Sequence, residues 1–444
     1  MFQRRKGIWS FLFNLKKMQE EFNAGKLYNL ISDKQNLEQN ILFLQVFSSE
    51  TVDEVWNKVN PFSEGYERKS GSLMQLLLIA FGAEGSFPAA IRNGQVHSPI
   101  RNYPKEKTLV LGNEFYDVPD GVVSQIVESL NIEHLIIESE AALAPVFDKD
   151  FRYISDFIRS CAFFRFESNY QFPEFFLSAK KIEELRFVAG RGAILPTDLS
   201  RMTSLVSYEL IDAKTEAVPK FDVIYKNLRH LSLSQSITYN AKSEVFDVAE
   251  LPKKLESIDL SACYISKLIG FEQLNSLKKL NLSNCKFSEL NLYEFPSTLE
   301  RLDLRSNQLT SFPSLKNCSE LSLIYIDLSY NQLTSIPEDL SPLKNLKEFL
   351  CSHNQLENIP SNINELEHLE RMDVRRNKLA TLPQSLKSLK KMVYIDLEDN
   401  FLSNIAPVIQ HWEIPDAKVA LRGNNFDNNE KKQLLEFENL KLDL

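Results

Sequence analysis

Paired-ligand and catalytic motifs are missing from this sequence of 444 residues. Its six histidines and five cysteines show neither HExxH nor CxxC spacing, so no metal site is predicted. The phosphate-binding motif GxxxxGK(S/T) and the nucleophile motif GxSxG are absent too. We therefore expect neither catalysis nor a bound cofactor.

Long apolar runs are missing as well. The longest candidate, LMQLLLIAF at 73–81, is far shorter than the roughly 20 residues that a transmembrane helix needs. The start of the chain, MFQRRKGIWSFLFNLKKMQEEF, has basic residues before an apolar patch, but no small-residue cleavage site follows it. We expect an amphipathic helix there and a cytoplasmic protein.

Positive charge is in deficit. The chain has 51 Lys and Arg against 60 Asp and Glu, a net charge of −9. Proteins that bind nucleic acid without sequence preference need clustered basic residues to neutralise phosphates. We therefore expect no nucleic-acid partner.

One sequence motif occurs five times between Leu299 and Leu402. It fits LxxLxLxxNxLxx(I/L)P, and its copies are LERLDLRSNQLTSFP, LIYIDLSYNQLTSIP, LKEFLCSHNQLENIP, LERMDVRRNKLATLP and MVYIDLEDNFLSNIA. Their asparagines stand 23 or 24 residues apart, at Asn307, Asn331, Asn354, Asn377 and Asn400. A unit this short cannot bury its own apolar face, so the units must stack into a solenoid.

Each copy predicts a short strand followed by a turn. In LERMDVRRNKL, Met372 and Val374 point inward, whereas Asp373 and Arg375 alternate outward. We expect the asparagine that follows to be buried, where its amide pairs with backbone groups of the turn. Four prolines after the turn suit the first position of short convex helices: Pro313, Pro337, Pro360 and Pro383.

The cysteines fit this scheme as small apolar residues. Cys263 and Cys285 take the asparagine place in adjacent units, and Cys351 takes an inward strand place. Neighbouring strands lie about 4.8 Å apart, so a disulfide between Cys263 and Cys285 is geometrically feasible. No secretion signal argues for an oxidising compartment, and we expect reduced cysteines.

The chain divides into four predicted segments. Residues 1–104 lack the motif and predict a small helical module that covers the first repeat. Residues 105–254 carry irregular copies with an insertion, residues 255–427 carry regular copies, and residues 428–444 predict a C-terminal helical cap. Three apolar residues of the cap are expected to close the last unit: Leu434, Leu435 and Phe437.

The irregular copies still predict strands. Apolar residues fit the strand places near residues 108–110, 132–137, 182–187, 205–210 and 228–233. The stretch from Phe163 to Phe176 is aromatic and ambiguous, so no strand is assigned there.

The copies resemble leucine-rich repeats of the intracellular type, whose LPxxLxxL segments match IPEDLSPLKNL and LPQSLKSLKKM. The resemblance covers residues 255–427 and extends back to about residue 105. In this region the chain is similar to cytoplasmic repeat proteins of bacteria, plants and animals, several of which dock small GTPases or phosphatases. It implies an α/β solenoid, a horseshoe with a parallel concave sheet and short convex helices, and a protein-binding role.

Outward strand places form the concave face of such a horseshoe. Its middle column reads Asp259, Asn281, Asp303, Asp327, Leu350, Asp373, Asp396 and Ala420. Stacked aspartates repel one another, and interleaved arginines offset that repulsion. We favour a self-neutralised, solvated face as the interpretation of the aspartates.

Aromatic and arginine residues of this face form the predicted binding site, because this is the composition of binding hot spots. The predicted partner-binding residues are Tyr325, Tyr330, His353, Arg371, Arg375, Arg376, Tyr394 and Phe401. Ordinary surface residues are an equally weighted alternative.

The leading hypothesis is a monomeric, non-catalytic scaffold or signalling module that binds a partner protein on its concave face. One alternative is an effector or enzyme-associated subunit whose activity resides in residues 1–104. Another is attachment to a membrane surface through the basic amphipathic start, residues 4–17. We favour a helix packed on the first repeat for that start, because Glu20 and Glu21 follow closely.

Overall fold

A computed structural model describes the repeat region of the chain. The described residues are 108–111, 133–137, 157–166, 179–189, 198–199, 201–213, 227–236, 244–249, 251–316, 318, 321–410, 412, 417–437 and 440–444. The predicted helical module at 1–104 lies outside them. The chain divides into two compact units, Met1–Gly190 and Arg191–Leu444, which are described in turn.

Parallel strands pair in chain order in the described part of the first unit. They are β1 (Thr108–Leu111), β2 (His134–Ile137), β3 (Ser160–Phe166) and β4 (Glu184–Ala189). Phe163 and Phe187 are register partners on β3 and β4, and their buried rings stack with centroids 5.1 Å apart. The sequence did not predict β3, since a register shift between Phe164 and Phe166 interrupts its alternation.

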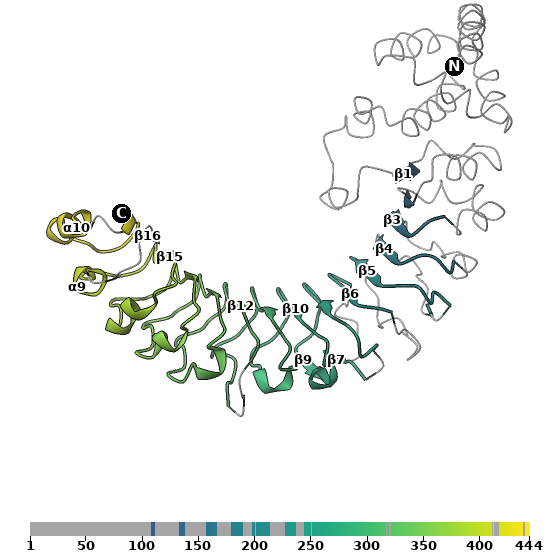
Figure 1. Cartoon of the computed structure of the whole chain (residues 1–444), viewed down its shortest axis with the longest axis horizontal. Helices are drawn as coiled ribbons and strands as arrows, with labels where there is room; N and C mark the ends of the chain where they lie inside the picture. Colours follow the sequence, from purple (N-terminus) through teal and green to yellow (C-terminus); the bar gives the residue numbers. More distant parts are fainter. Residues whose placement is uncertain are drawn as a thin grey trace, which may run out of the picture. The chain divides into compact units, whose positions relative to one another are not determined.

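The second unit is a solenoid with one strand of its main sheet in each turn. These strands are β5 (Ser207–Ile211), β6 (His230–Ser232), β8 (Ser257–Asp259), β10 (Lys279–Asn281), β11 (Arg301–Asp303), β12 (Tyr325–Asp327), β13 (Glu348–Leu350), β14 (Arg371–Asp373), β15 (Tyr394–Asp396), β16 (Ala417–Ala420) and β17 (Leu440–Asp443). They pair in parallel and line the inner side of this unit's arc (Figure 1). The predicted solenoid with a parallel concave sheet is confirmed.

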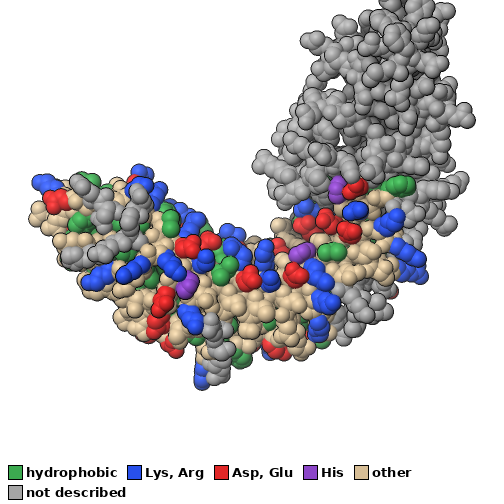
Figure 2. Space-filling view, in the orientation of Figure 1, with side chains coloured by type: hydrophobic (Ala, Val, Ile, Leu, Met, Phe, Trp, Pro, Cys, Tyr) green, Lys and Arg blue, Asp and Glu red, His purple; other side chains and the backbone are tan. Residues whose placement is uncertain are grey.

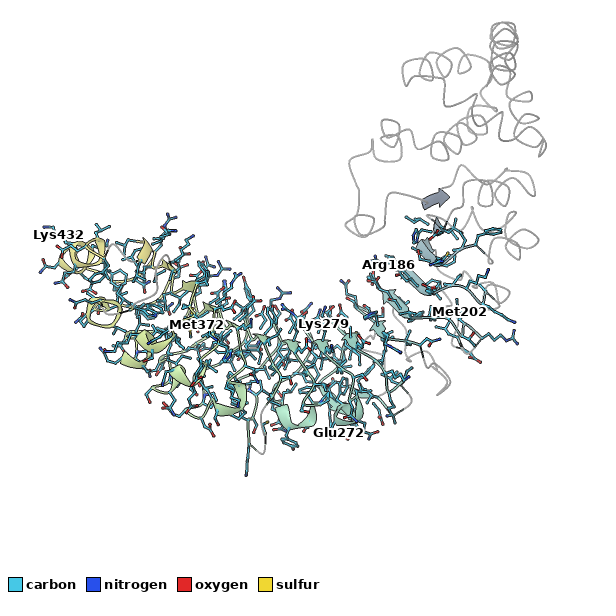
Figure 3. All side chains as sticks on the ribbon, in the orientation of Figure 1. Arg186, Met202, Glu272, Lys279, Met372 and Lys432 are labelled. Atoms are coloured by element: carbon cyan, nitrogen blue, oxygen red, sulfur yellow. The ribbon has the colours of Figure 1, made fainter. Side chains whose placement is uncertain are left out.

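The core lies between this sheet and the convex side. Met372 and Val374 are fully buried, as the alternation predicted, whereas Asp373 and Arg375 between and beyond them are partly exposed. Figure 3 shows Lys279 on the strand side of the unit and Glu272 on the opposite, convex side. Side chains of the concave strands are therefore separated from the convex surface by the apolar layer.

Short helical turns occupy the convex side. They are η6 (Phe271–Gln273), η7 (Leu292–Glu294), η8 (Ser341–Leu343), η9 (Ile363–Glu365), η10 (Gln384–Ser388), α9 (Ala406–Ile409) and α10 (Asn428–Leu435). Five of these seven described elements are 3-10 helices, which suits a convex segment of only a few residues. No helix in the described ranges is long and apolar enough to cross a membrane.

The prolines do not take the predicted first helical position. Pro383 is the extended residue that precedes η10, with φ −72° and ψ 144°, and its carbonyl accepts the amide of Leu386. Pro360 likewise lies ahead of η9 and accepts the amide of Ile363. The prediction was wrong because these prolines end the extended segment instead of starting the helix.

The insertion before the regular repeats contributes a second sheet. Within it, β7 (Val245–Asp247) pairs in parallel with β9 (Lys267–Ile269) of the next repeat. Both strands lie on the convex side of the solenoid (Figure 1). The central residue of each strand, Phe246 or Leu268, is buried beneath exposed neighbours.

The buried asparagines join successive turns, as predicted. Asn377 donates from Nδ2 to the carbonyls of Val374 (2.9 Å) and of Cys351 in the preceding turn (3.0 Å). Its Oδ1 accepts the amide of Leu356, also in the preceding turn, at 2.9 Å. We call the series Ser236, Cys263, Cys285, Asn307, Asn331, Asn354, Asn377, Asn400 and Asn424 the seam. None of the five cysteines, all of which the structure describes, forms a disulfide.

The last segment contains a strand besides the predicted helix. Helix α10 begins after Asp427, whose Oδ1 accepts the amide of Glu430 at 2.7 Å, and strand β17 then pairs with β16. Leu434 is fully buried, as predicted, but Leu435 is 71% exposed. Its predicted role in closing the last unit was wrong, because the next residue on a helix is rotated away from the buried face.

Candidate functional site

Strands β8 to β16 present three columns of outward side chains. The strand register aligns Arg301, Tyr325, Glu348, Arg371, Tyr394 and Lys418 in the first column, and the aspartates in the middle column. Figure 2 shows acidic and basic side chains interspersed over the visible face of the second unit. This mixture agrees with a face that is largely neutralised internally.

The middle column supports the turns. Oδ1 of Asp327 accepts the amide of Ser329 at 2.9 Å, and Asp373 holds the amide of Arg375 in the same way at 3.1 Å. Asn281 makes this bond with Ser283 at 3.0 Å, so a neutral amide can replace the carboxylate. These bonds favour the structural interpretation of the aspartates over a role in binding.

Two aspartates of the middle column have a raised pKa, to which a neighbouring aspartate contributes. Burial, followed by the neighbouring Asp396, raises the pKa of Asp373 to about 6 against the opposing effect of the backbone amide and arginines. Burial also raises the pKa of Asp303, with Asp327 adding to the shift. Leu350, half-buried between Asp327 and Asp373, interrupts the column with an apolar side chain.

Tyr325 is held from two sides. The guanidinium of Arg301 lies over its ring, 3.9 Å from the centroid, and its hydroxyl donates to Asp327 at 3.5 Å. Burial and the nearby carboxylates of Asp327 and Asp303 raise its pKa to about 12. The ring is therefore neutral and fixed in orientation at physiological pH.

Tyr394 repeats the arrangement on β15. Its hydroxyl donates to Asp396 at 2.9 Å, and the ring lies beside Arg371 (5.4 Å) and Lys418 (5.6 Å). Burial and the hydrogen bond to Asp396 raise its pKa to about 12. Tyr325 and Tyr394 thus both lie on concave strands, where neighbouring side chains support them.

Arg375 is less available than predicted. Its Nε lies 3.8 Å from Oδ2 of Asp373, the last residue of β14, and this Nε atom is buried. The positive charge of Arg375 favours the ionised form of Asp373, which accepts the amide of Arg375. A charge reversal at Arg375 would therefore perturb the turn after β14.

Five predicted residues lie beside the strands and not on them, and one of these is Arg375, two residues beyond the end of β14. Tyr330, His353 and Arg376 each precede a seam asparagine with a left-handed backbone, φ between 53° and 57°, and Phe401 follows Asn400. We call the series Ser306, Tyr330, His353, Arg376, Asp399 and Gly423 the rim column. The prediction that all eight residues share the strand face was wrong, because the left-handed residue turns the chain out of the sheet.

The rim column has contacts of its own. The rings of Tyr330 and His353 stack with centroids 4.0 Å apart, and Nε of Arg376 lies 3.1 Å from Oδ2 of Asp399. Burial, then Arg376 and Arg375, lowers the pKa of His353. Tyr330 and Phe401 are 48% and 55% exposed. The position just before each seam asparagine is the sequence signal that could have separated this rim from the strands.

Metal-binding geometry is absent from the residues that the structure describes, where no group of three His, Cys, Asp or Glu side chains could hold an ion. The buried cysteines are poor nucleophiles: burial raises the pKa of Cys285 to about 12 and also raises that of Cys161. His97 and His411 lie outside the described residues.

Comparison with sequence families identifies part of the repeat array. The profile of the Leucine Rich Repeat family matches residues 276–297, 298–318 and 322–343. No curated protein sequence matches the chain. The matched residues run from the turn before β10 to the end of η8.

Solved structures share the architecture. A leucine-rich repeat protein of Leptospira interrogans superposes with a TM-score of 0.57 at 20% identity, covering 79% of this chain and 98% of that one. A chain of the Toll and Spatzle complex of Drosophila gives a TM-score of 0.60 at 20% identity, covering 76% of this chain and 45% of that one. An internalin of Listeria monocytogenes gives 0.50 at 18%, covering 65% and 81%. Identities this low show the fold alone.

Proposed function

From the premise that this chain is a leucine-rich repeat protein, we propose that it binds a partner protein on the concave face of its second unit. The fold generally serves as a scaffold for interactions between proteins. We propose further that this chain is a non-catalytic, cytoplasmic monomer that needs no cofactor.

The supported tyrosines carry this proposal. Tyr325 and Tyr394 each present a half-buried ring whose hydroxyl is bonded to an aspartate and whose face lies beside an arginine. A ring that is already ordered loses little conformational entropy on binding, which favours it as an anchor. Neither ring belongs to the apolar layer between the sheet and the convex turns.

The proposed surface has two parts. The concave part contains Tyr325, Arg371, Arg375 and Tyr394, and the rim part contains Tyr330, His353, Arg376 and Phe401. The rim continues the concave part at the end of each strand, so a partner that fills the concave face also reaches the rim.

Titration of a captured partner tests the proposal. The partner is isolated from the source cells with the full chain as bait, and binding is measured with Tyr325→Ala and Tyr394→Ala. Each change is expected to weaken binding by about 1 kcal/mol or more, as at a hot spot. Lys390→Glu and Lys391→Glu on the convex side are controls, expected to stay within about 0.5 kcal/mol. Loss of binding in the controls alone would contradict the proposal.

A further inference from the structure

The two concave tyrosines belong to two copies of one arrangement. Each starts a Tyr-Ile-Asp strand, and each hydroxyl donates to the aspartate of its own strand. Each ring also lies beside the arginine of the preceding strand, Arg301 for Tyr325 and Arg371 for Tyr394. The two copies can therefore be compared directly.

The copies differ in the residue on the far side of the ring. Tyr325 is followed on β13 by Glu348, whose Oε1 lies 3.8 Å from Nη1 of Arg301. Tyr394 is followed on β16 by Lys418, a second cation. In the first copy the charge of Arg301 is offset by Glu348. In the second copy a cation lies on each side of the ring, Arg371 on one side and Lys418 on the other.

The cations beside Tyr394 differ from other basic residues of the concave face in their ion pairing. Within the described residues, Arg371 and Lys418 make no ion pair within 4.0 Å, although both are exposed. Other arginines of this face are paired, such as Arg305 with Asp303 at 3.6 Å and Arg422 with Asp443. Arg371 and Lys418 therefore keep positive charge available to a binding partner.

Nearby carboxylates are committed to the fold. Asp396 accepts the amide of Glu398 with Oδ1 and the hydroxyl of Tyr394 with Oδ2. Asp373 accepts the amide of Arg375, and Arg371 is among the groups that act to lower its pKa. These groups offset part of the positive potential but leave both cationic heads exposed to solvent.

The surroundings of Tyr394 extend this surface. Val393, the residue before Tyr394, is 63% exposed, and Lys441 on β17 aligns with Lys418 as the next residue of the column. An apolar side chain, an ordered ring and a row of cations therefore lie together. Their chemical complement is a carboxylate-bearing segment with apolar neighbours.

We infer that Arg371, Tyr394 and Lys418 form the docking site for an acidic segment of the partner protein. This inference rests on the proposed function and adds the charge of the partner. Arg371 and Lys418 lie two strands apart, about 10 Å, which about three residues of an extended segment span. Two carboxylates at that separation would each meet one cation, with the ring of Tyr394 between them.

Selection from a random dodecapeptide phage library on the immobilised full chain tests the inference. Peptides enriched on the wild type are expected to carry a net negative charge, because they must complement two cations. Each is then titrated against the double variant Arg371→Gln, Lys418→Gln, where binding should fall by about tenfold or more. The matched control, Arg305→Gln with Arg422→Gln, removes two arginines that are paired with Asp303 and Asp443 and should change binding by less than about threefold.

Circular dichroism and melting temperature confirm that all variants fold. The inference is overturned when no peptide is enriched, when enriched peptides are not acidic, or when they bind the Arg371 and Lys418 variant as tightly as the wild type. Neutral peptides that lose binding with Tyr325→Ala would overturn the acidic docking site but support concave binding. Peptides insensitive to both sets of changes would count against both proposals.

Discussion

The seam has a cysteine end, Cys263 and Cys285, and an asparagine end, Asn307 to Asn424. At both ends the side chain bonds to a buried backbone carbonyl of the preceding turn. Asn307 donates from Nδ2 to the carbonyl of Leu282 in the preceding turn at 2.8 Å. One turn earlier, the thiol of Cys285 donates to the carbonyl of Leu260 at 3.2 Å. Both residues therefore satisfy the buried carbonyl at the end of the preceding strand.

Of Asn307 and Cys285, only the asparagine also accepts a hydrogen bond from the preceding turn. Oδ1 of Asn307 accepts the amide of Phe287 at 3.2 Å. The equivalent amide one turn earlier, Ile265, bonds instead to the carbonyl of Cys263 at 3.0 Å. Cysteine and asparagine therefore both donate to the preceding turn, whereas only the Oδ1 of the asparagine adds a second bond between turns. We expect tighter coupling between turns in the asparagine part of the seam.

The largest effect is expected when a seam asparagine loses both its hydrogen-bond donor and its acceptor. Asn377→Leu leaves the carbonyls of Cys351 and Val374 and the amide of Leu356 without their side-chain partners. We expect a loss of about 3 kcal/mol in the free energy of unfolding, since buried groups stay unsatisfied. Denaturant unfolding measures it.

Asn425→Leu is the matched control, because Asn425 is exposed and follows the seam instead of forming it. Its effect should stay within about 0.5 kcal/mol. Equal midpoints for Asn377→Leu and the wild type would show that the seam bonds do not limit stability.

A smaller test converts one end of the seam into the other. Asn377→Cys keeps a donor for the carbonyl of Cys351 but removes the acceptor for the amide of Leu356. We expect a loss of about 1–2 kcal/mol, less than for Asn377→Leu. The same unfolding experiment measures it. A loss as large as that of Asn377→Leu would mean that the acceptor carries the whole effect.

The sequence predicted the features that recur with a fixed period. Strand places, the inward residues Met372 and Val374, and the buried Asn377 follow from a repeat that must bury one face. Strand β3 was missed because its alternation is interrupted, and β17 because it lies beyond the last copy of the motif. Periodicity finds elements that repeat, and these two do not.

The candidate site was predicted in composition but not in arrangement. Tyr330 and Arg376 themselves have a left-handed backbone, so the alternation of the preceding strand does not extend to them. The pairing of Arg301 with Glu348 depends on side-chain reach between β11 and β13, two strands apart. The contrast with Arg371 therefore emerges only when side-chain contacts are known.

The smallest effect is expected when an asparagine replaces Cys285, because the backbone amide that its Oδ1 would accept already has a partner. In Cys285→Asn, Nδ2 can replace the thiol as donor to Leu260, but the amide of Ile265 is already bonded to Cys263. The added volume at a place that is 5% exposed offsets any gain, so stability should change by less than about 0.5 kcal/mol.

Cys285→Ala separates the two functions at this site. It removes the donor to Leu260 without adding volume, and we expect a loss of about 1 kcal/mol, because one buried carbonyl loses its partner. Denaturant unfolding of both variants gives the comparison. If Cys285→Asn instead raised the free energy of unfolding by more than about 1 kcal/mol, the amide of Ile265 would have exchanged its partner. The cysteine end would then differ from the asparagine end only by its side chain, and not by its backbone bonding.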